Sequence, residues 1–433
     1  MNERLLQFIW QHQHYNRSAL MTEQGDSLEI INAGKWNANQ GPDFIEARIR
    51  IGQTTWVGNI ELHVQSSDWY KHNHDQDANY RNIILHVVWK NDEPEKSNLS
   101  RFIPILELQS RISKLVLKRY EELMDHVLFV PCEKHIPAIN ELLWQKWKER
   151  LLIERLQRKS VYIRRQLMQS NYHWEETLWW MIARNFGGKL NGESFEIVAK
   201  TIPLNILARH KNQLQQIEAL LFGQAGLLDI DFSKIPSREG QGVGNYPGML
   251  QKEYQFLCKK YKLQQPAVSM KFLRMRPSGF PTLRLAQLAV LIHQSSHLFS
   301  KMKELETVDE ARQLLDVCAN DYWHYHYRFD EAGSFKEKKV GADMVNNILI
   351  NTISPMLYTF GFHQGEPAYQ QKAIDWLEKM PAENNHLTRQ WQSLGVSIHQ
   401  AYDSQALIEL KTRYCENKRC LDCAIGHEIL KSL

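Results

Sequence analysis

The chain has 433 residues, of which 43% are hydrophobic, so it is long enough to bury the cores of two or three domains. Its formal net charge of +4 is too small to indicate a polyanion partner by itself, and no run of about 18 apolar residues indicates a transmembrane helix. Residues 1–15 lack the basic end and uninterrupted apolar stretch of a secretory signal, so we expect a cytoplasmic protein without a membrane partner.

The N-terminal part of the chain shows the alternation of β-strands. A short amphipathic helix is predicted over residues 4–14. Strands are predicted after it, at residues 27–31, 43–51, 54–64, 83–90 and 102–109. The second and third of these strands flank Gly52-Gln53, which predicts a hairpin. The run 83–89 is almost wholly apolar, which predicts a strand buried on both faces at the centre of the sheet.

From about residue 111 onward, apolar residues recur with the period of α-helices. Helices are predicted near residues 111–127, 139–169, 174–186, 206–222, 250–262, 282–298, 307–328, 340–359, 369–378 and 384–411. Gly187-Gly188 and Gly223 are predicted to end helices. The segment 231–248, rich in Gly, Ser and Pro, predicts a long loop or an internal boundary.

Together these patterns predict an α+β protein. A mixed-sheet module is expected over residues 1–112, a mainly helical region over residues 113–411, and a Cys-rich metal-binding segment over residues 412–433. The change of hydrophobic period sets the first boundary, and the spacing of the cysteines sets the second.

The densest group of chemically active residues lies in and beside the predicted hairpin. It comprises GPDF at 41–44, GNIELH at 58–63 and DWYKHNHDQD at 68–77. Asp43 at a strand start and Glu61 on the returning strand resemble the PD-(D/E)xK nuclease core, with His63 where that family usually has lysine. The whole chain also resembles an uncharacterised bacterial family known as a domain of unknown function, and this second resemblance implies no activity.

The nuclease resemblance implies metal-dependent hydrolysis of phosphodiester bonds, with DNA as the expected substrate. Asp43 and Glu61 would hold Mg²⁺ or Mn²⁺, and His63 would assist water or phosphate. Two carboxylates suffice, because Mg²⁺ keeps most of its waters and accepts substrate oxygens. A neutral imidazole does not reproduce the permanent charge of lysine. A non-catalytic nucleic-acid-binding or scaffold protein with a degenerate nuclease fold is therefore the alternative.

A third interpretation is a different metal-dependent hydrolase. Its ligands would come from His63, His72, His74 and Asp75. Glu29, on the first predicted strand, is a further candidate carboxylate. His86 lies inside an apolar strand, which is more typical of a core histidine with a hydrogen-bond partner than of a ligand.

The length of the hairpin turn decides whether these side chains meet. With a three-residue turn, Asp43 would lie opposite His63 and diagonal to Glu61. With a two-residue turn, Asp43 would face Leu62, and the cluster would form only if a β-bulge re-aimed the strand. A catalytic site at this place therefore depends on the register of the hairpin.

Two stretches concentrate positive charge on this nearly neutral chain, which favours a polyanion partner. In residues 142–167, the basic residues are interpreted as the solvated face of a helix that buries Trp144 and Trp147. Within residues 249–284, arginines and phenylalanines alternate around a turn, as in proteins that bind single-stranded nucleic acid. Nucleic-acid binding is predicted for Lys271, Arg274, Arg276 and Arg284. In the alternative, these arginines form ion pairs within a helical core.

Six cysteines are too few for a disulfide framework in a chain of this length. Cys415, Cys420 and Cys423 form a C-x4-C-x2-C motif, and His427 follows it. Three sulfurs and one nitrogen predict a tetrahedral Zn²⁺ site. The alternatives are a [4Fe-4S] cluster with a distant cysteine as the fourth ligand, and reduced thiols without a metal. The distant cysteines are Cys132, Cys258 and Cys318.

Overall fold

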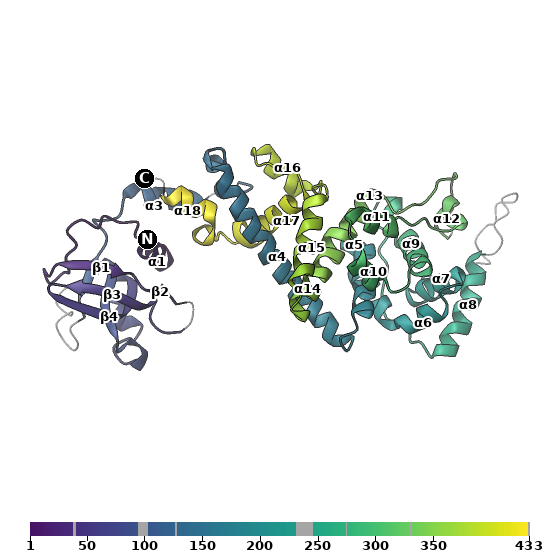
Figure 1. Cartoon of the computed structure of the whole chain (residues 1–433), viewed down its shortest axis with the longest axis horizontal. Coiled ribbons are helices and arrows are strands. Elements are labelled where there is room, and N and C mark those ends of the chain that lie inside the picture. Colours follow the sequence, from purple (N-terminus) through teal and green to yellow (C-terminus); the bar gives the residue numbers. More distant parts are fainter. Residues whose placement is uncertain are drawn as a thin grey trace. The chain divides into compact units, whose positions relative to one another are not determined.

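The computed structural model describes residues 1–37, 40–93, 103–125, 128–230, 246–273, 275–329 and 331–431. The chain divides into two compact units. Unit 1 comprises Met1–Trp147 together with Leu410–Leu433, and unit 2 comprises Lys148–Glu409 (Figure 1). The change of period near residue 111 and the C-terminal cysteines thus both lie inside unit 1, and the expected boundary at 231–248 falls mostly outside the described residues.

Unit 1 is built on a mixed sheet with the strand order β1-β3-β4-β5-β6, in which β2 also pairs with β3. Its strands are β1 (Leu28–Asn32), β2 (Lys35–Trp36), β3 (Phe44–Ile51), β4 (Thr54–Gln65), β5 (Ile83–Lys90) and β6 (Ile105–Glu107). β1, β3 and β4 are antiparallel, which confirms the predicted hairpin, whereas β4, β5 and β6 are parallel. β5 is an inner strand and its first six residues are buried, as its apolar sequence predicted.

Helices and short turns complete unit 1. They are α1 (Glu3–Gln11), α2 (Asp68–Lys71), η1 (Ala78–Tyr80), α3 (Lys114–Asp125), η3 (Glu133–Ala138), η7 (Leu410–Cys415), η8 (Cys420–Asp422) and α18 (Ala424–Lys431). The Asn2 side chain accepts a hydrogen bond from the Leu5 N–H at 2.9 Å and begins α1. Leu6 and Ile9 are fully buried, and α1 packs against β4. α18 lies beside α3, where Arg119 donates to the Ile429 carbonyl oxygen at 3.0 Å (Figure 1).

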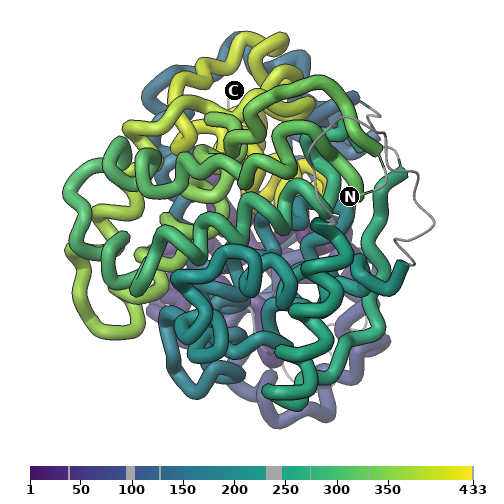
Figure 2. The backbone as a smooth tube through the Cα atoms, turned by 90° about the vertical axis from the view of Figure 1, so that its right-hand side faces the viewer, coloured from purple at the N-terminus to yellow at the C-terminus, as the bar shows by residue number. Residues whose placement is uncertain are grey.

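Unit 2 is mainly helical, which with the sheet of unit 1 confirms the α+β class. Its elements are α4 (Glu141–Gln169, which begins in unit 1), α5 (Trp174–Thr201), α6 (Leu204–Arg209), α7 (Leu214–Gln224), α8 (Tyr246–Tyr261), η5 (Pro277–Gly279), α9 (Pro281–Gln294), α10 (Leu298–Glu304), α11 (Val308–Leu315), α12 (Asp321–Tyr325), β7 (His326–Arg328), β8 (Glu331–Ala332), α13 (Ala342–Ile348), η6 (Leu349–Ile353), α14 (Ser354–Gln364), α15 (Pro367–Lys379), α16 (His386–Ser393) and α17 (Ala401–Glu409). Figure 2 faces this unit and shows its helices, teal to yellow-green, packed side by side. None of the described helices has both the length and the apolar character that a bilayer span requires.

The predicted helix end at Gly187-Gly188 is a kink. Gly188 has φ 60°, which breaks α5, but the chain continues in helical turns to Thr201. A Cβ atom on Gly187 would lie 2.8 Å from the Cα of Gly192, so the two segments approach closely at this point. The predicted helix end is therefore confirmed at Gly188, where the non-helical backbone of glycine ends one helical segment and a second segment follows directly.

Several basic residues of α4 face acidic residues of unit 2. Lys148 is 4% exposed, and its Nζ lies 3.0 Å from Asp403 Oδ1. Arg155 and Arg158 both bind the carboxylate of Glu409, at 3.2 and 2.6 Å from its Oε2. The interpretation as a solvated face is therefore wrong for these three cations, since a charge removed from water requires a partner and α17 supplies it. It is confirmed for the exposed Lys146, Arg150, Arg164 and Arg165.

Candidate functional site

A β-bulge in β3 brings Asp43 opposite Glu61. The hairpin has a two-residue turn, the case in which Asp43 was expected to face Leu62. The register shifts between Phe44 and Ala47, however, so that residues nearer the start of β3 pair one position earlier along β4. The shift moves Asp43 from the position facing Leu62 to the position facing Glu61.

Two residues of β3 form the bulge that shifts the register. Ile45 and Glu46 together occupy the place opposite one residue of β4. Glu46 has φ 59°, a left-handed conformation that side chains other than glycine seldom adopt. Its carboxylate lies 2.5 Å from Lys35 Nζ at the surface. The site is thus formed by a local backbone distortion that the alternating sequence of β3 does not reveal.

The carboxylates of Asp43 and Glu61 each accept a hydrogen bond from a backbone N–H of the other residue's strand. The Asp43 N–H donates to Glu61 Oε2 and the Leu62 N–H donates to Asp43 Oδ2, both at 3.0 Å. The Gln7 amide donates to Asp43 Oδ1 at 2.7 Å. Burial raises the pKa of both carboxyl groups, and the charge of Asp43 raises the pKa of Glu61 further. The pair therefore holds a proton at neutral pH unless a cation replaces it.

Glu3 contributes a third carboxylate that no sequence pattern marks. Its Oε1 lies 4.0 Å from His63 Nε2, and its charge raises the pKa of both Asp43 and Glu61. Glu3 lies in the first turn of α1, far along the chain from the hairpin. Packing of α1 against β4 brings Glu3 to the site. Only the tertiary structure therefore identifies Glu3 as a member of this group.

His63 and His86 form a buried imidazole pair on the face of the sheet that carries Glu61. β4 and β5 are parallel, and Glu61 pairs with His86. His63 Nδ1 lies 2.9 Å from His86 Nε2, so one ring donates to the other. Burial and the neighbouring histidines lower the pKa of His63 to about 2. His63 is therefore neutral and does not supply the charge of a lysine, but it keeps a nitrogen lone pair for a cation.

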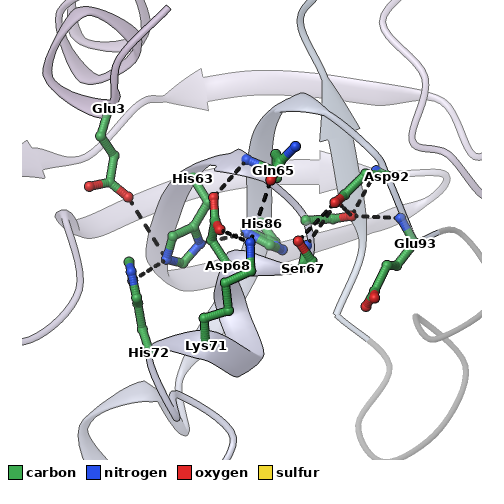
Figure 3. A network of polar contacts seen from close by, with 11 residues as sticks. Glu3, His63, Gln65, Ser67, Asp68, Lys71, His72, His86, Asp92 and Glu93 are labelled. Atoms are coloured by element: carbon green, nitrogen blue, oxygen red, sulfur yellow. Dashed lines mark hydrogen bonds and ion pairs between the residues drawn. The ribbon is translucent and has the colours of Figure 1, made fainter.

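His72 and His74, from the loop after α2, complete the group. His72 Nδ1 lies 3.2 Å from His63 Nε2, and His74 Nε2 lies 3.4 Å from Glu61 Oε1. One nitrogen from each of the three histidines lies within 4.8 Å of the others. Figure 3 shows Glu3 and His72 directed at the His63 ring. We call the following residues the acid–histidine cluster: Glu3, Asp43, Glu61, His63, His72 and His74.

The buried nitrogen of His74 lacks a hydrogen-bond partner. His74 Nε2 is buried, and although Glu61 Oε1 lies 3.4 Å from it, no atom in the described parts of the chain makes a hydrogen bond to it. An unpaired buried polar atom costs free energy, so native proteins satisfy such atoms with water or an ion. Carboxylate oxygens and neutral imidazole nitrogens are both metal ligands. The donor set of the cluster and this nitrogen therefore fit a bound divalent cation.

Two aspartates fix the loop that carries His72 and His74 (Figure 3). Asp68 accepts the Gln65 N–H at 3.0 Å, at the end of β4. Asp92, after β5, accepts the Ser67 N–H at 3.0 Å and its hydroxyl at 2.8 Å. Because these bonds join the loop to both strands, they limit the positions that the two histidines can take.

Two other predicted candidates lie outside the cluster. Glu29 pairs with Arg50 Nη1 at 2.6 Å, and both side chains are exposed. Asp75 is exposed as well. The structure thus brings together Asp43, Glu61 and His63 with two of the loop histidines, and it does not bring Glu29 to them.

The C-terminal cysteine motif and His427 both lie in unit 1. The His427 ring packs against His12, with 4.0 Å between ring centroids. The thiols of Cys420 and Cys423 interact electrostatically with that of Cys132. The sequence alone had left Cys132 as one of several distant cysteines; the remaining ones, Cys258 and Cys318, lie in unit 2.

The residues predicted to bind nucleic acid belong to unit 2, and Arg274 lies outside the described residues. Lys271 and Arg276 are exposed in the segment that precedes α9. Arg284, in α9, is half-buried and donates to Gln287 Oε1 at 3.0 Å, and burial lowers the pKa of its guanidinium. Two of the described candidates are thus available to solvent, whereas the third is packed against its own helix.

One family model matches most of the chain. It is described as a protein of unknown function, DUF2851, and it matches residues 3–386. The chain belongs to this family. The match confirms the resemblance to a domain of unknown function, and the matched residues of DUF2851 include the whole acid–histidine cluster. No curated protein and no solved structure matches the chain. Because DUF2851 carries no assigned activity, the chemistry of the site has to be inferred from its side chains.

Proposed function

We propose that this protein is a metal-dependent nuclease whose active site is the acid–histidine cluster. The observation that carries the proposal is the meeting of three carboxylates with three imidazoles on one face of the sheet, where His74 Nε2 is buried without a hydrogen-bond partner among the described residues. Strongly raised carboxyl pKa values in such a group are typical of functional sites.

Mn²⁺ fits the cluster better than Mg²⁺. Mg²⁺ prefers oxygen ligands and retains its waters, whereas mixed carboxylate and imidazole ligands suit transition metals. The trio His63, His72 and His74 supplies the nitrogens, and Asp43 and Glu61 supply the oxygens. When bound, such a metal supplies a nucleophilic hydroxide at neutral pH and stabilises charge on a phosphoryl group.

The surrounding residues have separate tasks in this proposal. Asp43 and Glu61 hold the cation, and the N–H groups that bind their carboxylates fix the orientation of both. His86 orients His63 through the bond between His63 Nδ1 and His86 Nε2, as a second hydrogen-bonded group commonly does for a metal-bound histidine. His72 is exposed, so it is the imidazole of the cluster that substrate and solvent reach.

Nucleic acid is the proposed substrate, with DNA first among the forms to assay. Two features support it: the likeness of the Asp43, Glu61 and His63 arrangement to the PD-(D/E)xK core, and the exposed cations Lys271 and Arg276. The histidine trio favours one rival, a hydrolase that uses the same metal site on a different substrate. A second rival is a protein that binds nucleic acid without cleaving it.

The test is a cleavage assay with the full-length protein after removal of its metals. End-labelled single- and double-stranded DNA and RNA are incubated with Mn²⁺, with Mg²⁺ and without metal. We expect cleavage with Mn²⁺, and a loss of about a hundredfold or more in Asp43→Asn and in Glu61→Gln, the size typical for removal of a group that acts in the reaction. Melting temperatures measured in parallel show whether the variants are folded.

Glu29→Gln is the matched control, because Glu29 is a carboxylate of the same sheet that is paired with Arg50 outside the cluster. The Glu29→Gln variant should cleave nucleic acid at the wild-type rate. Equal cleavage by wild type and both cluster variants would exclude this site as the catalytic centre. Mn²⁺ binding without cleavage of any nucleic acid would favour the rival hydrolase, and binding of nucleic acid without cleavage would favour the non-catalytic protein.

A further inference from the structure

Four cysteines of unit 1 approach one another from two distant parts of the chain. Cys132 lies between α3 and η3, whereas Cys415 ends η7, Cys420 begins η8 and Cys423 precedes α18. All four are free thiols, and all except Cys415 are buried. Cys415 interacts electrostatically with the other three thiols, and Cys132 interacts with Cys420 and Cys423. The four thiols are therefore neighbours, although among the described residues only the trio His63, His72 and His74 has three ligand atoms within 4.8 Å of one another.

Contacts of neighbouring residues hold the two segments together. The Lys418 ammonium group donates to the carbonyl oxygen of Met124, at the end of α3. Lys411 Nζ lies 5.1 Å from the centroid of the Phe129 ring. Both contacts join the C-terminal segment to the stretch of chain that leads to Cys132. The approach of the cysteines is thus part of the packing of unit 1.

Hydrogen-bond donors surround the sulfur of Cys423. The N–H groups of Ile425 and Gly426, in the first turn of α18, both donate to it. A neutral thiol is a weak acceptor, so donors gathered on one sulfur favour a thiolate. Hydrogen bonds to the sulfurs are a general feature of metal–thiolate centres, in which they tune and orient the ligands.

Gly426 allows the motif to fold tightly. A Cβ atom at this position would lie 2.1 Å from the carbonyl oxygen of Cys420, so any other residue would displace the η8 turn from α18. The Cys423 N–H also donates to the Cys420 carbonyl oxygen at 3.3 Å. Glycine thereby lets the η8 turn, which contains Cys420, pack closely against the start of α18, which follows Cys423.

We propose that unit 1 contains a four-thiolate metal centre, either zinc or an iron–sulfur cluster, formed by Cys132, Cys415, Cys420 and Cys423. Soft thiolate ligands select these metals over Mg²⁺ or Mn²⁺. Without a metal, burial raises the pKa of these thiols and keeps them protonated, and metal binding releases the protons. The centre is distinct from the acid–histidine cluster, with which it shares no residue.

Cys132 takes the position that the spacing of the C-terminal motif had offered to His427. The His427 Nε2 lies 3.4 Å from the Nε2 of His14, and its ring packs against His12. The link from His427 to the motif is the backbone bond from its N–H to the Cys423 carbonyl oxygen, at 2.8 Å. The geometry therefore favours four sulfurs over three sulfurs and one imidazole.

The test measures metal in full-length protein purified without oxygen. We expect about one zinc per chain, or about four irons with matching acid-labile sulfide and a brown absorbance. Cys132→Ser and Cys423→Ser should each lose most of this metal, and His427→Ala should retain it. Retention by Cys132→Ser together with loss by His427→Ala would overturn the proposal, as would the absence of both metals from wild type.

Cys258→Ser and Cys318→Ser are matched controls, because these cysteines lie in unit 2 and should not affect the metal. Glu61→Gln should also retain it, which separates this proposal from the nuclease proposal. If Cys132→Ser does not fold, X-ray absorption of the wild-type metal decides the ligands. Sulfur scatterers at about 2.3 Å alone support the centre, and a nitrogen at about 2.0 Å overturns it.

Discussion

At the scale of single residues, burial shifts the pKa values of the acids and of the histidines at the site in opposite directions. Burial raises the pKa of Asp43 and Glu61, and it lowers the pKa of His63 and His86. All four groups are therefore shifted toward their neutral forms. A divalent cation would reverse this for the acids, because it replaces the proton as the partner of the carboxylates.

The first prediction concerns the pH dependence of stability. The folded pKa of Asp43 and Glu61 lies above the unfolded value, so the folded state binds more protons at these two groups, and their contribution to the stability of metal-free protein falls as pH rises from about 5 to about 8. Mn²⁺ needs the ionised pair, so the rise in Tm that it causes should grow over the same range. Thermal unfolding with and without Mn²⁺ measures both effects. A Mn²⁺ effect independent of pH, or one unchanged in the double variant Asp43→Asn/Glu61→Gln, would contradict this.

The second prediction concerns His63. His63→Lys would place an ammonium group where the imidazole is 0% exposed and would remove the contact with His86. We expect Mn²⁺ affinity to fall by about tenfold or more, measured by calorimetry on metal-stripped protein. His12→Lys, at a half-buried histidine outside the cluster, is the control. Higher affinity and faster cleavage in His63→Lys would show instead that the histidine is a weakened lysine.

At the scale of elements, the hairpin β3–β4 shows how a site can depend on one irregular residue. The two-residue turn would have placed Asp43 opposite Leu62. The bulge at Ile45 and Glu46 shifts the register, and Asp43 then meets Glu61. Strand irregularities of this kind are common beside active sites, because they re-aim a side chain without changing the rest of the sheet.

The third prediction tests the conformation of the bulge. Glu46→Gly should raise the free energy of unfolding by up to about 1 kcal/mol, because glycine adopts φ 59° without strain. Glu46→Ala removes the same exposed ion pair with Lys35 but keeps a Cβ atom, so it should give no such gain. Urea denaturation of the three proteins measures the difference. Equal stabilities of the glycine and alanine variants would mean that the backbone at Glu46 is not strained.

At the scale of the whole molecule, the two basic stretches have different surroundings. Lys148, Arg155 and Arg158 of α4 bind acidic residues inside unit 2. Lys271 and Arg276 are exposed. Local charge in the sequence therefore does not distinguish a cation that stabilises a helical core from one that is available to a polyanion.

The fourth prediction follows from this contrast. If the protein binds nucleic acid through the second stretch, the double variant Lys271→Ala/Arg276→Ala should reduce the slope of log K against log salt by about one to two. Lys379→Ala/Arg389→Ala removes two exposed cations from other helices of unit 2 and should leave the slope unchanged. Binding titrations at several salt concentrations measure the slopes. An unaltered slope in the first variant would assign Lys271 and Arg276 to solubility or packing.

The sequence by itself determined the fold class, the hairpin, the inner strand β5 and the residue types of the candidate site, because period, turn residues and motif spacing are local properties. Tertiary structure decided which of these side chains meet. Glu3 joins the cluster through the docking of α1, Asp43 reaches Glu61 through a bulge, and Cys132 approaches Cys423 because unit 1 is made from both ends of the chain. Contacts between distant segments depend on packing and register, which the order of residues does not express locally.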